Sequence, residues 1–205
     1  MWSREAVRGF FTTGLAARGA LVWHTAHLDR LEEHAAHFGI PFDRVYLENR
    51  MREMLDGKHG FLRCRIVYSF ETGEWRIETA PFSPSLLPFR CRVVEIDHPF
   101  GRWKTIPRRS FGLSTNEEVI LVEKGSGRVL EGSYTNVFLF RGETVLTPPA
   151  DGSILPGVCR ARFMLFLSAS GYKVIEKTFR VTDLNNGKLF LTNALRGVIP
   201  ALLER

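Results

Sequence analysis

The chain has 205 residues, of which 44% are hydrophobic and 24% are charged; this composition is typical of a folded globular protein and excludes a disordered or fibrous one. No apolar run approaches the roughly 20 residues that a membrane-spanning helix needs, and residues 1–5 do not lead into the apolar segment of a secretion signal. The net charge of +6 is spread along the chain without a basic block, so we expect no nucleic-acid partner, whereas abundant arginine suits small anionic ligands.

The first 80 residues have the pattern of a small α/β lobe. Leu28, Leu31 and Ala35 recur at helical spacing, and Gly39 marks the end of this helix. Alternating apolar residues, interrupted by the turn glycines Gly19 and Gly73, are typical of strands. We therefore expect strands at 9–16, 20–23, 61–69 and 74–80, and helices at 25–38 and 42–55.

A proline-rich stretch divides the chain near its middle. Three prolines fall within residues 80–88, and we expect a linker at 81–88 between a lobe of residues 1–80 and a lobe of residues 89–205. The predicted fold class is α+β, with two small α/β lobes and a ligand site in the cleft between them. In the second lobe we expect a helix at 158–169 and strands at 89–97, 118–123, 129–131, 136–140, 172–177 and 188–192.

Cysteine and histidine usage favours neither a disulfide framework nor a metal centre. Cys64, Cys91 and Cys159 are odd in number and widely spaced, which favours a reducing cytoplasm. Cys159 opens the helix expected at 158–169, where its thiol is either activated by the helix N-terminus or simply packed. Four histidines lie in the helix expected at 25–38 or directly before it, and structural roles are expected for them rather than metal binding: His24, His27, His34 and His37.

One lysine differs from the others in its surroundings. Lys104 lies between Trp103 and Ile106 in a bulky, partly apolar segment, and a lysine that reacts as a free amine needs partial desolvation or a neighbouring cation. An ordinary interfacial lysine explains the same pattern equally well. The remaining lysines lie near turns or at the ends of an exposed strand: Lys58, Lys124, Lys173, Lys177 and Lys188.

Several short motifs occur in a fixed order around Lys104. His27-Leu-Asp-Arg30-Leu precedes it, and Glu131-Gly-Ser-Tyr-Thr-Asn136, Leu146-Thr-Pro148, Leu155-Pro-Gly157-Val158-Cys159 and Thr192-Asn193-Ala194 follow it. Together they resemble the class IV aminotransferases, the fold-type IV group of pyridoxal phosphate enzymes. That group includes branched-chain aminotransferase, D-amino-acid aminotransferase and 4-amino-4-deoxychorismate lyase. The resemblance extends over about residues 10–200.

The resemblance implies the D-amino-acid aminotransferase-like fold and pyridoxal 5′-phosphate as the cofactor. Lys104 would carry the cofactor as a Schiff base and move the proton at the reacting carbon. Glu131 would lie against the pyridine nitrogen and keep it protonated. The phosphate would be bound by Arg30, by the helix N-terminus at Gly157, Val158 and Cys159, and by Thr192, Asn193 and Ala194.

Two arginines, Arg30 and Arg65, each have two possible roles that the resemblance does not decide between. Arg30 flanks the apolar face of its helix, so an exposed surface arginine is the alternative to a phosphate ligand. Arg65 shares one face of the strand at 61–69 with Arg63, which indicates either a wall that binds substrate carboxylates or a solvated sheet face. Arg65 is the better candidate for a substrate-binding residue.

Three functions stay open at this point. The chain is short, and the segment after Lys104 is shorter than in the longer aminotransferases, which is similar to a compact lyase-like subgroup. This slightly favours a lyase that converts 4-amino-4-deoxychorismate to 4-aminobenzoate and pyruvate. The alternatives are an aminotransferase for branched-chain or D-amino acids and a non-catalytic binding protein on the same scaffold. The resemblance also implies a homodimer that acts on a small anionic amino substrate.

Overall fold

A computed structural model describes residues 7–85, 87–97, 101–107 and 110–204. The chain divides into two compact units. The first contains the described residues up to Pro84 together with 103–107, and the second contains the described residues of 85–102 and of 110–204. Each unit has its own sheet and its own core, and each is described separately.

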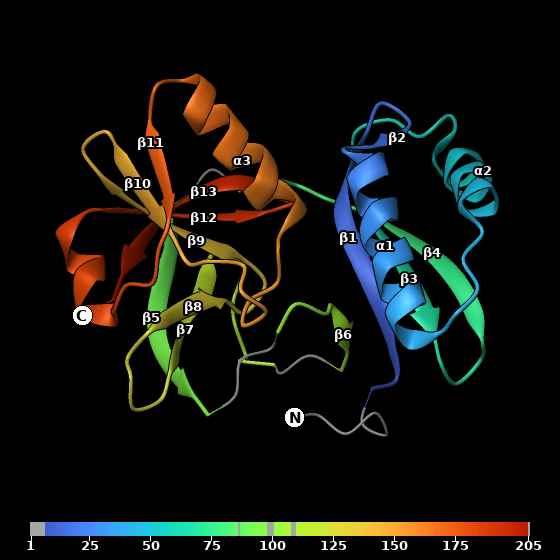
Figure 1. The fold of residues 1–205 in the computed structure, drawn as a ribbon. Helices are drawn as coiled ribbons and strands as arrows, with labels where there is room; N and C mark the ends of the chain where they lie inside the picture. The colour runs from blue at the N-terminus through green and yellow to red at the C-terminus, as the bar shows by residue number, and fades with distance from the viewer. Residues whose placement is uncertain (1–6, 86, 98–100, 108–109, 205) are drawn as a thin grey trace. The chain divides into compact units, whose positions relative to one another are not determined.

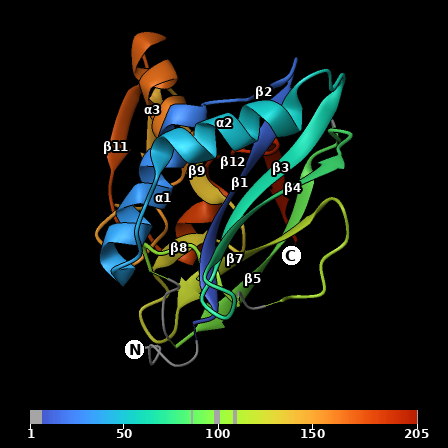
Figure 2. The same ribbon diagram turned by 90° about the vertical axis from the view of Figure 1, so that its right-hand side faces the viewer.

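The first unit is a sheet with strand order β2-β1-β3-β4, to which β6 adds by pairing with β1 (Figure 1). Two helices cover one face of this sheet (Figure 2). Phe10, Leu28, Leu31, Leu47 and Ile66 form the centre of the core between the helices and the sheet. The elements are β1 (Gly9–Ala17), β2 (Ala20–Leu21), α1 (His24–Phe38), α2 (Arg44–Leu55), β3 (Phe61–Ser69), β4 (Glu74–Pro81) and β6 (Thr105–Ile106).

The helix ends follow from local chemistry. Gly39 ends α1 in a left-handed conformation with φ 71°, which glycine adopts without a steric penalty, and its N–H donates to the carbonyls of Ala35 and Ala36. Asp43 begins α2 by accepting a hydrogen bond of 2.9 Å from the N–H of Tyr46. The sequence predicted both helices within two residues of these bounds.

The two faces of the β1–β3 pair differ in burial. Phe10, Thr12, Gly14 and Ala16 alternate along β1 and are buried on the face that α1 covers. Gly14 has to be glycine because a Cβ there would lie 2.6 Å from Nε2 of His27. The residues between them are half-buried on the opposite face, where Thr13 of β1 pairs with Arg65 of β3.

The second unit is one mixed sheet with strand order β11-β10-β9-β12-β13-β5-β7-β8. Helix α3 packs against β11, β12 and β13 (Figure 1). A large core cluster centred on Phe89, Ile120, Val137 and Leu191 fills the unit. The elements are β5 (Phe89–Ile96), β7 (Glu117–Glu123), β8 (Val129–Gly132), β9 (Asn136–Arg141), β10 (Thr144–Thr147), α3 (Val158–Ala169), β11 (Lys173–Glu176), a 3₁₀ helix (Val181–Asn186), β12 (Lys188–Asn193) and β13 (Gly197–Leu203).

The structure differs from the sequence-based expectation at several short elements. The strands β6, β10 and β13 and the 3₁₀ helix were not predicted, because β6 and β10 are very short and Pro200 argues against a strand in the sequence of β13. Pro200 nevertheless pairs with Phe190 within the β12–β13 ladder.

The expected lobe boundaries also need a correction at Lys104. The sequence assigned this lysine to the lobe of residues 89–205, but 103–107 group with the first unit because β6 pairs with β1. A local sequence pattern does not reveal such a long-range pairing of only two residues.

Candidate functional site

Lys104 lies just before β6 and is half-buried. Its main-chain carbonyl accepts a hydrogen bond of 3.0 Å from the N–H of Phe11, and its Nζ lies 5.1 Å from the centre of the Phe11 ring. The side chain of Arg65 lies over the same ring, with its Cζ 4.3 Å from the ring centre. Two of the residues predicted for the site, Lys104 and Arg65, therefore meet at Phe11.

Helix α1 carries a buried polar stripe. His27, Arg30 and His34 follow each other at helical spacing and all three are buried. The alternative of an exposed Arg30 is therefore wrong. His27 and Thr12 share a hydrogen bond of 2.6 Å, and His34 accepts one of 2.8 Å from the N–H of Lys104.

Both buried histidines are neutral near neutral pH. Burial lowers the pKa of His27 to about 3, and the charges of Arg30 and Lys104 act in the same direction. Burial, with the charge of Arg30 as the next cause, likewise lowers the pKa of His34 to about 3. Two cations thus lie near two uncharged imidazoles. Among the described residues, no group of three or more His, Cys, Asp or Glu side chains is arranged to hold a metal ion.

In the second unit, Glu131 and Asn136 hold one residue, Leu155, from both sides. Glu131 is buried in β8, and its carboxylate accepts a hydrogen bond of 3.1 Å from the N–H of Leu155. Asn136, the first residue of β9, donates through Nδ2 to the carbonyl of Leu155 over 2.8 Å. Leu155 lies two residues before Gly157, so these bonds fix the approach of the chain to α3.

The N-terminus of α3, Asn136 and Thr192 lie together. A Cβ on Gly157 would lie 2.1 Å from Oδ1 of Asn136, so only glycine fits there. Asn136 pairs directly with Thr192 across the β9–β12 ladder, which places both side chains on the same face of the sheet. Thr192 is buried, and its hydroxyl has no hydrogen-bond partner among the described residues. Gly157 begins α3 without a side-chain cap.

Two further predicted residues at this end of the unit have clear structural roles. Burial raises the pKa of the Cys159 thiol to about 12, so the packed alternative holds and the activated one does not. Asn193 uses its side-chain oxygen to accept from the N–H groups of Leu195 and Arg196, over 3.1 and 2.7 Å, and so forms the turn after β12. Val158 is buried and Ala194 is half-buried.

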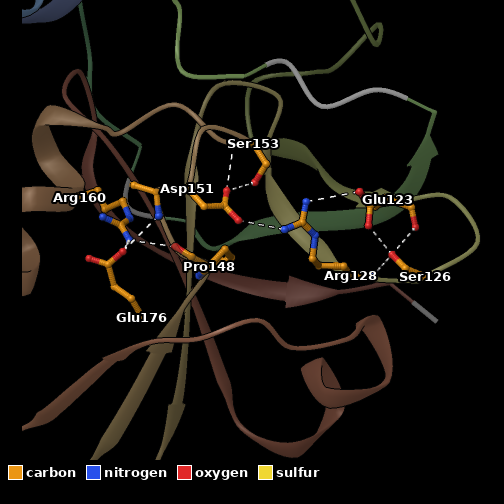
Figure 3. Close-up of polar contacts among 9 residues, drawn as sticks. Glu123, Ser126, Arg128, Pro148, Asp151, Ser153, Arg160 and Glu176 are labelled. Atoms are coloured by element: carbon orange, nitrogen blue, oxygen red, sulfur yellow. Dashed lines mark hydrogen bonds and ion pairs between the residues drawn. The ribbon is translucent and has the colours of Figure 1, made fainter.

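The loop that leads to α3 is held by two arginines (Figure 3). Arg160, in the first turn of α3, donates to the carbonyl of Pro148 over 2.9 Å and pairs with Glu176 over 3.0 Å. Arg128 lies between Glu123 and Asp151, at 3.4 and 3.2 Å (Figure 3). The loop thus has a defined path before it reaches the peptide held by Glu131.

A second buried carboxylate was missed in the sequence. Glu118 is fully buried in β7 and accepts hydrogen bonds from the side chains of Ser133 and Thr135, over 2.5 and 2.9 Å, and from main-chain N–H groups of the same loop. Burial raises its pKa, and these hydrogen bonds partly offset the effect. The sequence contained a sign of this burial, because strand alternation places Glu118 on the same face as the apolar residues Ile120 and Val122.

The comparisons with known proteins match the second unit most clearly. Residues 108–203 match the family model described as Amino-transferase class IV. Branched-chain-amino-acid aminotransferase 2 of Arabidopsis thaliana is 37% identical over 71 residues, which are 34% of this chain and 18% of that protein. Branched-chain-amino-acid aminotransferase 1 of the same plant is 32% identical over 83 residues, which are 40% of this chain and 22% of that protein. The matched part of this chain thus spans about a fifth of the length of these relatives.

Solved structures match nearly the whole chain. One assigned as an amino-acid aminotransferase from Mesorhizobium loti has a TM-score of 0.82 at 29% identity, and the match covers 96% of this chain and 99% of that chain. One assigned as a 4-amino-4-deoxychorismate lyase from Legionella pneumophila has a TM-score of 0.81 at 20% identity and covers 96% and 83%. A hypothetical aminotransferase from Mycobacterium tuberculosis in its PLP-bound form has a TM-score of 0.81 at 20% identity and covers 96% and 81%.

The close approach of Gly157 to Asn136 predicts a non-additive pair of substitutions. We expect Gly157→Ala to lower the free energy of unfolding by about 1–3 kcal/mol, because the added Cβ displaces the Asn136 side chain. In an Asn136→Ala background the same change costs clearly less, since the obstructing oxygen is gone. Chemical denaturation of the four proteins of this cycle measures the difference, and strictly additive effects would show that the contact does not matter.

The two neutral histidines predict a loss of stability in weak acid. Their pKa is about 3 in the folded chain, whereas an unperturbed histidine has a pKa of 6.5, so below about pH 6.5 the unfolded chain binds protons that the folded chain does not. The free energy of unfolding should fall as the pH drops from 6.5 towards 3, by on the order of 2 kcal/mol per histidine at about pH 5.

The measurement is chemical denaturation at pH 7 and pH 5, with the double substitution His27→Gln and His34→Gln as the control. Glu118 has a raised pKa and acts in the opposite direction, but it is present in both proteins and its effect cancels. An equal loss of stability in the two proteins would refute the assignment to the histidines.

Proposed function

We propose that the chain is a pyridoxal 5′-phosphate enzyme of the class IV aminotransferase family, which uses Lys104 to act on a small anionic amino substrate. Residues 108–203 match the model of that family, and 96% of the chain matches the structure assigned as an amino-acid aminotransferase from Mesorhizobium loti. The α+β fold expected from the sequence is confirmed by these comparisons. The observation that carries the proposal is the half-buried Lys104, which lies beside a buried arginine and two neutral histidines.

The residues present fit an anionic cofactor. The uncapped N-terminus of α3, the bare Cα of Gly157 and the unpartnered, buried hydroxyl of Thr192 offer hydrogen-bond donors to a phosphate. We propose that Arg30 adds the charge that balances it.

The proposed reaction needs the cofactor and two side chains, Lys104 and Glu131. When bound, pyridoxal phosphate supplies an electron sink for the negative charge that develops on the substrate carbon. Lys104 would carry the cofactor, and its Nζ would remove and return the proton at the substrate carbon. Glu131 would keep the ring nitrogen protonated. Its hydrogen bond to the N–H of Leu155 keeps the carboxylate oriented within the buried interior of the second unit.

Two reactions are compatible with these roles. Amino transfer is favoured by the curated relatives, which are aminotransferases, and by the Mesorhizobium loti structure, which this chain covers almost completely. The lyase reaction, in which 4-amino-4-deoxychorismate yields 4-aminobenzoate and pyruvate, is favoured by a structure assigned as such a lyase, which covers 98% of this chain at 26% identity. Pyruvate release from aminodeoxychorismate, compared with amino transfer from common amino acids, separates the two.

Substrate recognition is assigned to the half-buried face of the first sheet. Arg65 lies on this face over the Phe11 ring, close to where Lys104 contacts the same ring. A guanidinium in this place can bind a carboxylate through two hydrogen bonds. We also propose that the protein is a homodimer and that it is located in the cytoplasm, as expected from the sequence. None of the helices in the described part of the chain has both the length and the hydrophobicity required to cross a membrane.

The assignment of Lys104 predicts where a reduced cofactor is found. We expect borohydride treatment of the purified protein, followed by peptide mapping, to place the pyridoxyl label on Lys104. Lys104→Ala should lose both the label and turnover, whereas Lys58→Ala, which changes another lysine of the first unit, should keep both. A label on a different lysine in the unsubstituted protein would contradict the proposal.

The role of Arg65 predicts a change in substrate affinity. Arg65→Gln should raise KM for acidic substrates roughly ten- to a hundredfold, the usual effect of losing a charge-assisted hydrogen bond, with kcat less affected. Arg63→Gln is the matched control, because Arg63 is exposed two residues earlier on the same face. Kinetics of Arg65→Gln that equal those of the parent in both reactions would remove Arg65 from the site.

A further inference from the structure

The main chain of Lys104 is held on both sides. Its N–H donates to Nε2 of His34 over 2.8 Å, and its carbonyl accepts from the N–H of Phe11 over 3.0 Å. The second of these bonds belongs to the ladder that β6 forms with β1, so it is ordinary sheet pairing. The first is different, because it joins the lysine to a side chain of α1.

His34 is well suited to accept this bond. It is only 1% exposed, and its low pKa of about 3, caused first by burial, keeps the ring neutral at physiological pH. A neutral imidazole has one donor and one acceptor nitrogen. Since Nε2 accepts from Lys104, the proton resides on Nδ1. A protonated His34 would have no acceptor and would lose this contact.

The residue before the lysine reinforces the same contact. The Trp103 ring lies edge-on to His34, with ring centres 5.0 Å apart, and stacks on His37 at 4.0 Å with an angle of 13° between the planes. Trp103 and Lys104 are therefore both attached to the C-terminal half of α1, one through its side chain and the other through its N–H.

Arg30 lies one turn before His34 on α1, and both are buried on the same face of the helix. A single rigid helix thus carries the arginine proposed to bind the phosphate and the histidine that holds the lysine. We propose that His34 is a positioning residue, whose contact with the Lys104 main chain makes α1 set the place of the reactive amine relative to Arg30. This inference rests on the proposed function.

The test compares three substitutions of His34 with a control on the same helix. In Gln the side-chain carbonyl can reach the position of Nε2 and accept the same N–H, whereas Leu cannot accept it and Asn is one bond too short. His24→Gln changes an exposed histidine of α1 and is the control. The first readout is amide exchange at Lys104, measured by NMR in the full chain as purified.

We expect amide exchange at Lys104 to be at least about tenfold faster in His34→Leu and His34→Asn, and to stay within about threefold of the parent in His34→Gln and His24→Gln. The second readout is kinetic. Because a displaced amine affects the chemical step, kcat should fall on the order of a hundredfold in His34→Leu with little change in KM, and His34→Gln should restore most of it.

Unchanged exchange in a folded His34→Leu protein would overturn the proposal, as would equal kcat values for the Gln and Leu variants. If His34→Leu does not fold, the Gln and Asn pair decides, and equal protection in these two would refute the role of His34. Borohydride labelling separates this outcome from a failure of the proposed function. A label absent from Lys104 in the unsubstituted protein refutes the cofactor assignment, while the exchange data still report on the His34 contact alone.

Discussion

The parallel pairing of β5 with β7 imposes the constraint on which the candidate site depends. Two neighbouring parallel strands require a crossover connection, because a short turn cannot reverse the chain twice. Here the connection runs through residues 97–116, and it adds β6 to the sheet of the other unit. Lys104 lies on this crossover. The topology of the second sheet therefore explains why Lys104 is packed among residues far from it in sequence, on β1 and α1.

In the second unit, the hydrogen bonds of Glu131 and Asn136 meet at one residue, Leu155. Leu155 receives a carboxylate on its N–H side and an amide on its carbonyl side, and the next turn of chain begins α3. Glu118 holds the loop between Glu131 and Asn136 by a set of hydrogen bonds at a fully buried carboxylate. A buried carboxylate is stable only when its hydrogen-bond donors are in place. Glu118 therefore holds the loop in the conformation that places Glu131 and Asn136 on either side of it.

Most helices and strands could be predicted from hydrophobic periodicity and turn residues, because these patterns depend only on neighbouring residues in the sequence. The bounds of α3 agree with the expectation at 158–169, and β3 agrees at 61–69. The site was readable only in part. The motifs around Lys104, Glu131 and Gly157 indicated residue types and order, but the partner of the Lys104 N–H is His34, 70 positions away. Helical phase placed Arg30 beside the apolar face, whereas the packing of the first unit buries it. Long-range pairing and burial of polar groups decide these points, and neither has a local pattern.

The charge arrangement of the first unit explains why its two buried histidines stay neutral. Arg30 is buried and its charge, with that of Lys104, acts on both neighbouring histidines. Had either imidazole been protonated, a third cation would have been placed in the same low-dielectric region at a considerable cost. By remaining neutral, His27 and His34 satisfy the hydrogen bonds of Thr12 and Lys104 without adding charge. The positive charge of this region therefore resides on Arg30 and Lys104 and not on the two imidazoles.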